Sequence, residues 1–193
     1  MNDESRIVTV FGGARVPADD GLYTECVQLG RLLGEAGFVV ASGGYTGTME
    51  AVLRGASEAG AHTIGYTCAT FEADFQPNPW VAEERKTRVL SARIQRLAEE
   101  SDAFVVVHGG LGTLAELALV WNMMLAGELA VKPLAVVGPE WPRVIDQVHA
   151  ETQMGSSALR LLTLAATPQQ AVQRLQALLA ESYRAAGPGW LFR

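Results

Sequence analysis

A glycine-rich turn lies between an apolar, β-branched run at residues 105–107 and a helix-forming segment. It reads His108-Gly109-Gly110-Leu111-Gly112-Thr113. Glycines let the backbone turn tightly and approach a ligand closely, and the first turn of a helix presents unpaired N–H groups and a positive dipole end to anions. Glu116 follows Thr113 by three residues, so the two side chains share one face of the helix. The spacing predicts a phosphate-binding turn with a carboxylate about one helical turn away, which suits acid–base chemistry on a phosphorylated small molecule.

Two other predicted strands also end in a pair of glycines. Gly12 and Gly13 follow the apolar run 7–11, and Gly43 and Gly44 follow the run 38–41. In an open parallel sheet, ligands bind in the crevice beyond the carboxyl ends of the strands. We therefore expect the three turns to line one pocket. The predicted binding residues are Gly12, Gly13, Ala14, Gly43, Gly44, Gly47, Gly109, Gly110, Leu111, Gly112 and Thr113.

The spacing of apolar residues predicts strands that alternate with helices. The predicted strands cover residues 7–11, 38–41, 63–66, 103–107, 134–137 and 161–166. The predicted helices cover residues 23–36, 48–60, 83–100, 111–126 and 168–183, the last beginning with a Thr cap, a Pro and a Gln at its third position. Residues 68–81 contain two prolines and little periodicity, and are expected to form a loop or lid.

Alternating strands and helices are typical of an α/β fold, a doubly wound parallel sheet with helices on both faces. The continuous apolar strands fit this fold, because such strands are covered on both sides. Neither a linker nor an internal repeat is evident. We therefore predict a single domain over residues 1–193, with its core at about 6–183 and a loose tail at 184–193.

The composition limits which binding partners and which cellular compartment are expected. The chain has 193 residues, 49% of them hydrophobic and 19% charged, and a net charge of −6 without a basic patch, so nucleic acid is not an expected partner. No segment resembles a signal peptide or reaches the length of a membrane span, so we expect a cytoplasmic protein that does not bind a membrane. Cys26 and Cys68 lack CxxC spacing and are expected to be buried free thiols. An acidic protein can still bind phosphate, since local dipoles outweigh a distant, screened net charge.

Cofactor and metal signatures are missing. The turn after residue 11 is not GxGxxG, and the segment 44–48 lacks the lysine of a P-loop. His62 and His149 have no Cys, Asp or Glu at metal-ligand spacing. The sequence therefore predicts neither a cofactor nor a metal site, and a pocket for a small nucleotide or sugar phosphate.

Four ordered motifs resemble the LOG family, named after the "lonely guy" cytokinin-activating enzymes and often mislabelled as lysine decarboxylases. The family's hallmark PGGxGTxxE aligns with residues 108–116, where His108 stands in place of the proline. Segments 8–15 and 43–51 resemble two further family blocks. The fourth block is Arg93, which lies eight residues before the sequence Ser-Asp-Ala-Phe at 101–104. The resemblance covers residues 8–137, about two-thirds of the chain.

The resemblance implies a Rossmann-like fold, a homodimer, and hydrolysis of the N-glycosidic bond of a nucleoside 5′-monophosphate, such as AMP or a cytokinin-type nucleotide. It assigns catalysis to Arg93 and Glu116, and phosphate binding to the glycine turn and Thr113. The plant-like enzymes carry a second glutamate and a lysine where this chain has Ala115 and Ile94. The chemistry also suits these residue types, since a carboxylate stabilises positive charge on the ribose and can activate water.

Some alternatives remain open at this point. Arg85-Lys86 imitates the family's Arg-Lys pair, but lies two helical turns too far from Ser101, so Arg93 is preferred. His108 is either a strand-end residue with a local hydrogen bond or an acid near the ligand. Trp121, Met123 and Met124 belong to the core or to a dimer interface. The alternative function is a non-catalytic carrier of a nucleotide or pterin cofactor from the same superfamily.

Overall fold

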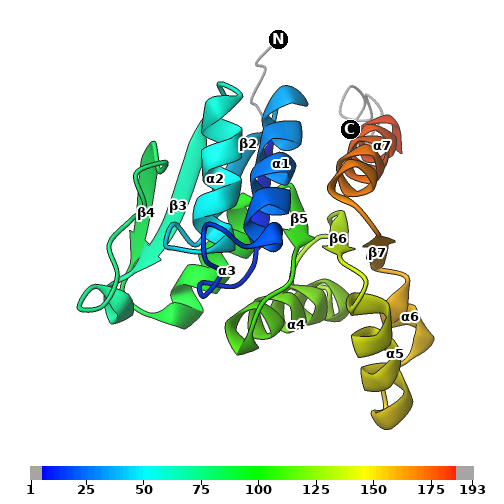
Figure 1. The fold of residues 1–193 in the computed structure, drawn as a ribbon. Coiled ribbons are helices and arrows are strands. Elements are labelled where there is room, and N and C mark those ends of the chain that lie inside the picture. The colour runs from blue at the N-terminus through cyan, green and yellow to red at the C-terminus, as the bar shows by residue number, and fades with distance from the viewer. Residues whose placement is uncertain (1–5, 186–193) are drawn as a thin grey trace, which may run out of the picture.

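A seven-stranded sheet forms the centre of the molecule. The computed structural model describes residues 6–185, and its strands run in the order β4-β3-β2-β1-β5-β6-β7 (Figure 1). All neighbouring strands are parallel, so their carboxyl ends share one edge of the sheet. The strands are β1 (Ile7–Phe11), β2 (Val39–Ser42), β3 (Thr63–Cys68), β4 (Glu83–Thr87), β5 (Ala103–Val106), β6 (Leu134–Val137) and β7 (Leu162–Ala165).

The strand order reverses between β1 and β5. From β1 the chain builds outward through β2, β3 and β4, and then returns to the other side of β1 to add β5, β6 and β7. Such a reversal opens a crevice at the carboxyl ends of the two central strands, where ligands of this fold class bind. The observed sheet confirms the predicted doubly wound α/β architecture.

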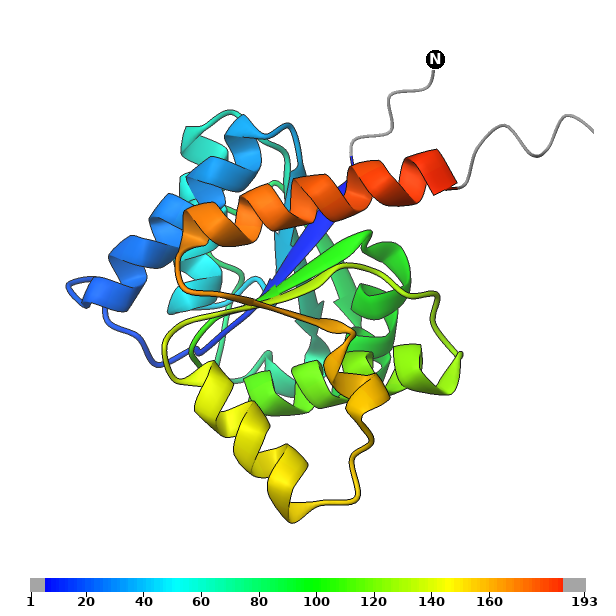
Figure 2. The same ribbon diagram turned by 90° about the vertical axis from the view of Figure 1, so that its right-hand side faces the viewer.

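Helices cover both faces of the sheet (Figure 2). One face is covered by α1 (Gly21–Glu35), α2 (Thr48–Glu58) and α7 (Pro168–Ala185). The other is covered by α3 (Leu90–Glu100), α4 (Leu111–Ala126), α5 (Trp141–Glu151) and the short α6 (Ser156–Leu159), and a 3-10 turn, η1 (Ala69–Phe71), follows β3. None of the helices within residues 6–185 is long and apolar enough to cross a membrane.

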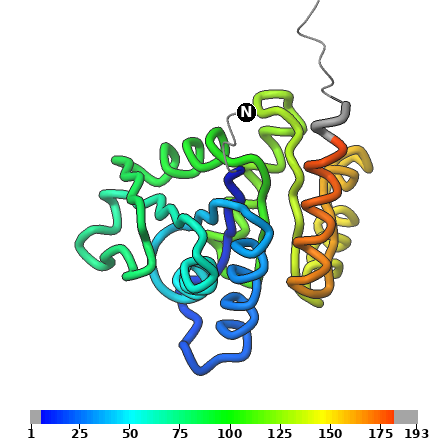
Figure 3. The backbone as a smooth tube through the Cα atoms, turned by 90° about the horizontal axis from the view of Figure 1, so that it is seen from above, coloured from blue at the N-terminus to red at the C-terminus, as the bar shows by residue number. Residues whose placement is uncertain are grey.

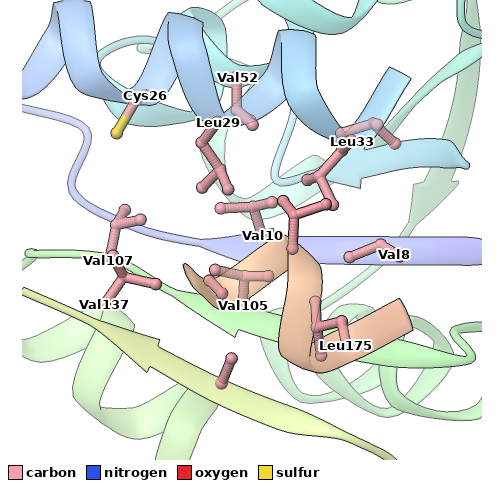
Figure 4. Close-up of a cluster of buried hydrophobic side chains, with 14 of the residues drawn as sticks. Val8, Val10, Cys26, Leu29, Leu33, Val52, Val105, Val107, Val137 and Leu175 are labelled. Carbon is pink, nitrogen blue, oxygen red and sulfur yellow. The ribbon is translucent and has the colours of Figure 1, made fainter. Parts of the chain in front are cut away.

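The core on the α1 face is built from small and branched side chains (Figure 4). Val8 and Val10 of β1 pack beneath Leu29 and Leu33 of α1, and all four are at most 2% exposed. Helices α1 and α2 lie side by side (Figures 1 and 3). Gly30 permits this close packing, because a Cβ there would lie 1.9 Å from a backbone oxygen of α2. The glycine thus allows the close approach of α2, which starts at one of the three predicted ligand-binding turns.

The prediction of one helix over residues 83–100 is wrong. Its first part is the strand β4, and only Leu90–Glu100 is helical. Partly buried and exposed residues alternate along β4, which is the period of a strand at the edge of a sheet. Edge strands commonly carry charges, and here Arg85 of β4 forms ion pairs with Glu83 and with Glu100 of α3.

Two helices were not predicted, because no element was assigned to residues 138–160, where α5 and α6 lie. The predicted start of the last helix is confirmed, since the backbone N–H of Gln170 donates to the hydroxyl of Thr167. The two free cysteines, Cys26 and Cys68, are buried as predicted. Residues 184 and 185 of the predicted tail belong to α7, and the remainder of that tail lies outside the described residues.

Candidate functional site

The three glycine turns meet at the carboxyl ends of β2, β1 and β5, the three central strands. The N–H of Gly13 donates to the carbonyl of His108 at 3.3 Å, which joins the turns after β1 and β5. The N–H of Thr48 donates to the carbonyl of Gly13 at 2.9 Å, and the hydroxyl of Thr46 donates to the carbonyl of Ala14 at 3.0 Å. These hydrogen bonds join the three turns into one connected rim at the carboxyl edge of the sheet.

Two of the glycines are required by how closely the turns approach one another. Gly47 has φ +68°, and a Cβ on it would lie 2.3 Å from the carbonyl oxygen of Gly13. A Cβ on Gly109 would lie 2.9 Å from the backbone nitrogen of Gly13, in the turn after β1, and 2.1 Å from the hydroxyl oxygen of Thr113. Larger residues at either position would push the turns apart and open the rim.

The start of α4 has the features of an anion site. Its N-cap is Gly110, in an extended conformation and without a capping side chain. Gly110, Leu111 and Gly112 are exposed, whereas Thr113 is 3% exposed and packs beneath Gly109. Uncapped N–H groups at a helix start, together with the helix dipole, favour a bound phosphate.

A buried ion pair lies next to this helix start. Arg93 of α3 and Glu116 of α4 are 5% and 7% exposed, and Arg93 Nη2 lies 3.5 Å from Glu116 Oε1. Arg93 Nε donates to the carbonyl of Tyr66 at 2.7 Å, and the guanidinium lies 5.8 Å from the centre of the Tyr45 ring. A Cβ on Gly43 would lie 2.0 Å from Arg93 Nη2, so that glycine leaves room for the guanidinium. The turn after β2 thus determines where the arginine lies.

Burial has the largest effect on the pKa of Glu116. Removal from water raises the pKa of its carboxyl from 4.5 to about 7, and the positive charge of Arg93 only partly opposes this rise. A carboxyl with a pKa near neutrality can both accept and release a proton in the physiological range. The raised pKa of Glu116, a buried carboxyl beside the positive charge of Arg93, is suited to acid–base chemistry.

The other residues that the sequence suggested for the site, Arg85, Lys86 and His108, do not contact the pair of Arg93 and Glu116. Arg85 and Lys86 are on β4, and Arg85 is engaged by Glu100, which leaves Arg93 as the arginine beside Glu116. His108 pairs through Nδ1 with Glu140 Oε1 at 3.0 Å. Its side chain is 61% exposed.

Trp121, Met123 and Met124 are buried in the core, so the core alternative is confirmed for them. Tyr45 was missed, although it lies within the predicted turn 43–47. No cluster of three His, Cys, Asp or Glu residues able to hold a metal is found within residues 6–185.

Comparison with known proteins identifies the family. The sequence profile of the SLOG cluster4 family matches residues 5–172. The chain belongs to the SLOG cluster4 family. This confirms the family resemblance seen in the motifs.

The SLOG chain is similar to plant proteins that are named cytokinin riboside 5′-monophosphate phosphoribohydrolases. The cytokinin riboside 5′-monophosphate phosphoribohydrolase LOG of Oryza sativa subsp. japonica is 28% identical over 181 residues, which cover 91% of this chain and 75% of that protein. LOG3 of Arabidopsis thaliana, named for the same activity, is 27% identical over 176 residues, which cover 89% of this chain and 82% of that protein.

Two solved structures share the fold of this SLOG chain. The Moco carrier protein from Chlamydomonas reinhardtii has a TM-score of 0.68 and 27% identity, with coverage of 92% of this chain and 99% of that one. The molybdenum cofactor binding protein from Rippkaea orientalis has a TM-score of 0.72, with coverage of 91% and 98%. At 22% identity, the second likeness concerns the fold alone.

Proposed function

We propose that this protein hydrolyses the N-glycosidic bond of a nucleoside 5′-monophosphate, such as AMP or a cytokinin-type nucleotide, to a free base and ribose 5-phosphate. The observation that carries the proposal is the buried pair of Arg93 and Glu116 beside an uncapped helix start. The names of the LOG relatives from rice and Arabidopsis support the same reaction.

The phosphate is held by the turn at the start of α4. The exposed amides from Gly110 to Gly112 bind its oxygens, and Thr113 completes the first helical turn beneath Gly109. The turns after β1 and β2 close the rim around the ribose, through Gly12, Gly13, Ala14, Gly43, Gly44 and Gly47. This arrangement directs the anomeric carbon, C1′, towards Glu116, one helical turn further along α4.

Cleavage moves electrons from the C1′–N bond to the departing base and builds positive charge on the ribose. The Glu116 carboxylate stabilises that charge and accepts a proton from the water that attacks C1′. The Arg93 guanidinium stabilises the electron density that leaves with the base. The water adds its oxygen to C1′. The base takes up one proton as Glu116 releases the proton that it accepted, so that the products are neutral base and ribose 5-phosphate and the carboxylate is restored.

A product assay tests this function. Purified protein is incubated with AMP, IMP, GMP, CMP and N6-isopentenyl-AMP, and the free base is quantified by chromatography. The expected result is base release that is lost in Glu116→Gln. A folded wild-type protein that releases base from none of these nucleotides would refute the hydrolase.

The second candidate is a carrier of a phosphorylated pterin cofactor. It is supported by the likeness to the Chlamydomonas Moco carrier protein at 27% identity. The same helix start would bind the cofactor's phosphate, and Glu116 would have no proton to transfer. Tight binding of such a cofactor without base release from any nucleotide would favour this candidate.

We also propose a homodimer formed through α4. Leu111, Leu114, Leu119 and Leu125 of this helix are exposed, at 82%, 41%, 39% and 49%. Beside them lies a groove of about 440 Å³ between α4 and α5, lined by Leu117, Ile145 and Trp141. The indole N–H of Trp141 has no hydrogen-bond partner within the described residues. Exposed apolar surfaces of this kind commonly mark a protein interface.

Light scattering on a sizing column tests the assembly. The wild-type protein is expected to elute with the mass of two chains, and Leu125→Asp with the mass of one. A wild-type protein that remains a monomer at high concentration would refute the dimer.

A further inference from the structure

The segment that follows β3 is attached at both ends to the turn after β2. At its start, the N–H of Cys68 donates to the hydroxyl of Tyr45 at 2.9 Å. At its end, the N–H of Asn78 donates to the carbonyl of Gly44 at 2.8 Å, and Asn78 Nδ2 donates to the carbonyl of Tyr45 at 2.7 Å. Residues 69–77 are therefore held over one of the three glycine turns, although they contain only a short 3-10 turn.

Two aromatic side chains of this segment pack against Tyr45. The Phe71 ring meets the Tyr45 ring edge-on at 5.9 Å, and the Phe75 ring lies 5.8 Å away at an angle of 50°. Tyr45 is 5% exposed, whereas Phe75 is 41% exposed. Since the guanidinium of Arg93 also lies over the Tyr45 ring, a continuous series of contacts leads from Glu116 to a phenyl ring at the surface.

More apolar surface lies at the start of α3. Val89, the N-cap of this helix, and Leu90 are 48% and 39% exposed. The hydroxyl of Thr70 donates to the carbonyl of Arg88 at 3.5 Å, which connects the two segments. Arg93 follows one turn later on α3, and its N–H donates to the carbonyl of Val89. Phe75 is thus connected to the buried ion pair through Tyr45, and Val89 and Leu90 are connected to it through the first turn of α3.

We propose that Phe75, with Val89 and Leu90, forms the wall that binds the nucleobase and that it selects purines over pyrimidines. This inference rests on the proposed hydrolysis of a nucleoside 5′-monophosphate. With the phosphate at the start of α4 and C1′ beside Glu116, the base extends past Arg93, towards the β3 side of the crevice. An exposed aromatic ring there stacks on the flat face of the base, and the larger face of a purine gains more from this contact.

The test separates base binding from phosphate binding in Phe75→Ala. The KM for AMP and the inhibition constant of ribose 5-phosphate, which has no base, are measured for wild type and variant. Loss of one stacking contact is expected to raise the KM for AMP by about 5-fold to 150-fold. The inhibition constant of ribose 5-phosphate is expected to stay within about twofold, since Phe75 does not contact the phosphate.

Two further variants control for structural effects. Phe75→Tyr keeps the ring and is expected to retain the wild-type KM for AMP. Leu164→Ala removes a side chain of the same exposure, 41%, from β7, and is expected to change neither constant. In the wild type, kcat/KM for AMP is expected to exceed that for CMP, and Phe75→Ala is expected to narrow the difference.

The outcomes distinguish this inference from the function on which it rests. If wild type hydrolyses AMP but Phe75→Ala leaves the KM for AMP unchanged, the proposed base wall is wrong. It is also wrong if Phe75→Ala weakens the binding of AMP and of ribose 5-phosphate equally. If wild type hydrolyses nothing, calorimetric binding of AMP and ribose 5-phosphate decides: a selective loss of AMP affinity in Phe75→Ala supports the wall although the hydrolase fails. If AMP does not bind at all, both proposals fall.

Discussion

Replacing Glu116 by Gln tests the catalytic pair with the smallest change in shape. Glutamine keeps an oxygen that can face Arg93 Nη2, now 3.5 Å from the carboxylate, but it cannot ionise or accept a proton. Because the pKa of Glu116 is about 7, close to nine in ten wild-type molecules carry the carboxylate at pH 8, against roughly one in ten at pH 6. The substitution therefore removes a group whose active form predominates in wild type above neutral pH.

The expected loss in kcat/KM at pH 8 is about 10²-fold to 10⁴-fold, the usual contribution of a positioned acid or base. In wild type, kcat/KM is expected to rise with pH through a midpoint near 7 and then level off, because the carboxylate is the active form. In Glu116→Gln this rise should be absent. The measurement is initial base release from AMP between pH 5.5 and 9. A variant that keeps more than about a tenth of the activity, or a flat wild-type profile, would refute proton transfer by Glu116.

The same substitution has an opposite effect on stability. The native pKa of Glu116 is raised above its ordinary value of 4.5, so between pH 4.5 and about 7 the native state binds more protons than the unfolded state. The contribution of Glu116 to the free energy of unfolding therefore falls as pH rises through this window, by about 3 kcal/mol in total, and is constant above it. Glutamine resembles the protonated form, so at pH 8 the variant should unfold at a higher urea concentration than wild type.

A matched control comes from an exposed pair of the same residue types. Glu58 lies 2.8 Å from Arg54 on α2, and both side chains are 44% exposed. Glu58→Gln is expected to change the free energy of unfolding by less than about 0.5 kcal/mol and to leave base release unchanged. If Glu116→Gln instead unfolds far more easily than wild type at pH 8, attraction to Arg93 outweighs burial, and the raised pKa is wrong.

Three other substitutions follow from the same geometry. Gly43→Ala places a methyl group where Arg93 Nη2 lies and should lower kcat/KM at least about tenfold with the fold intact, as checked by kinetics and circular dichroism. Gly30→Ala brings a methyl group against a backbone carbonyl of α2, which cannot yield as a side chain can, and should lower the free energy of unfolding in urea by about 1–3 kcal/mol or more. Arg93→Met removes the cation that opposes the rise in the pKa of Glu116, so any residual activity should show a midpoint above 7.

Much of the central fold was predictable because local and long-range signals agree there. β1, α4 and β6 have the predicted bounds, since each is a mainly apolar segment bordered by glycine, proline or polar residues. β4 was not predicted as a strand, because its five residues, Glu-Glu-Arg-Lys-Thr, show no alternation of apolar and polar side chains. Their strand form depends on hydrogen bonds from β3 and on Glu100 beside Arg85, which are contacts with distant parts of the chain.

Some features of the candidate site could likewise be predicted from the sequence, and others could not. The meeting of the three glycine turns follows from parallel strands and one reversal of strand order, so it could be predicted from sequence. The identity of Arg93 came from spacing within a family motif. The contact between Tyr45 and Arg93 could not be predicted, because it joins the turn after β2 to α3 through packing that no local pattern encodes. The placement of Phe75 against Tyr45 is equally non-local.

The burial of the ion pair bears on the choice between hydrolase and carrier. Taking an arginine and a glutamate out of water costs several kcal/mol for each ion, and attraction repays this only in excellent geometry. Here the guanidinium and the carboxylate lie 3.5 Å apart, and burial raises the pKa of Glu116 more than the charge of Arg93 lowers it. A carrier needs only the phosphate-binding turn and a wall for its ligand, and an apolar pair at these positions would make it more stable. A hydrolase uses a buried carboxyl beside a fixed positive charge, so the burial of Arg93 and Glu116 together favours turnover over transport.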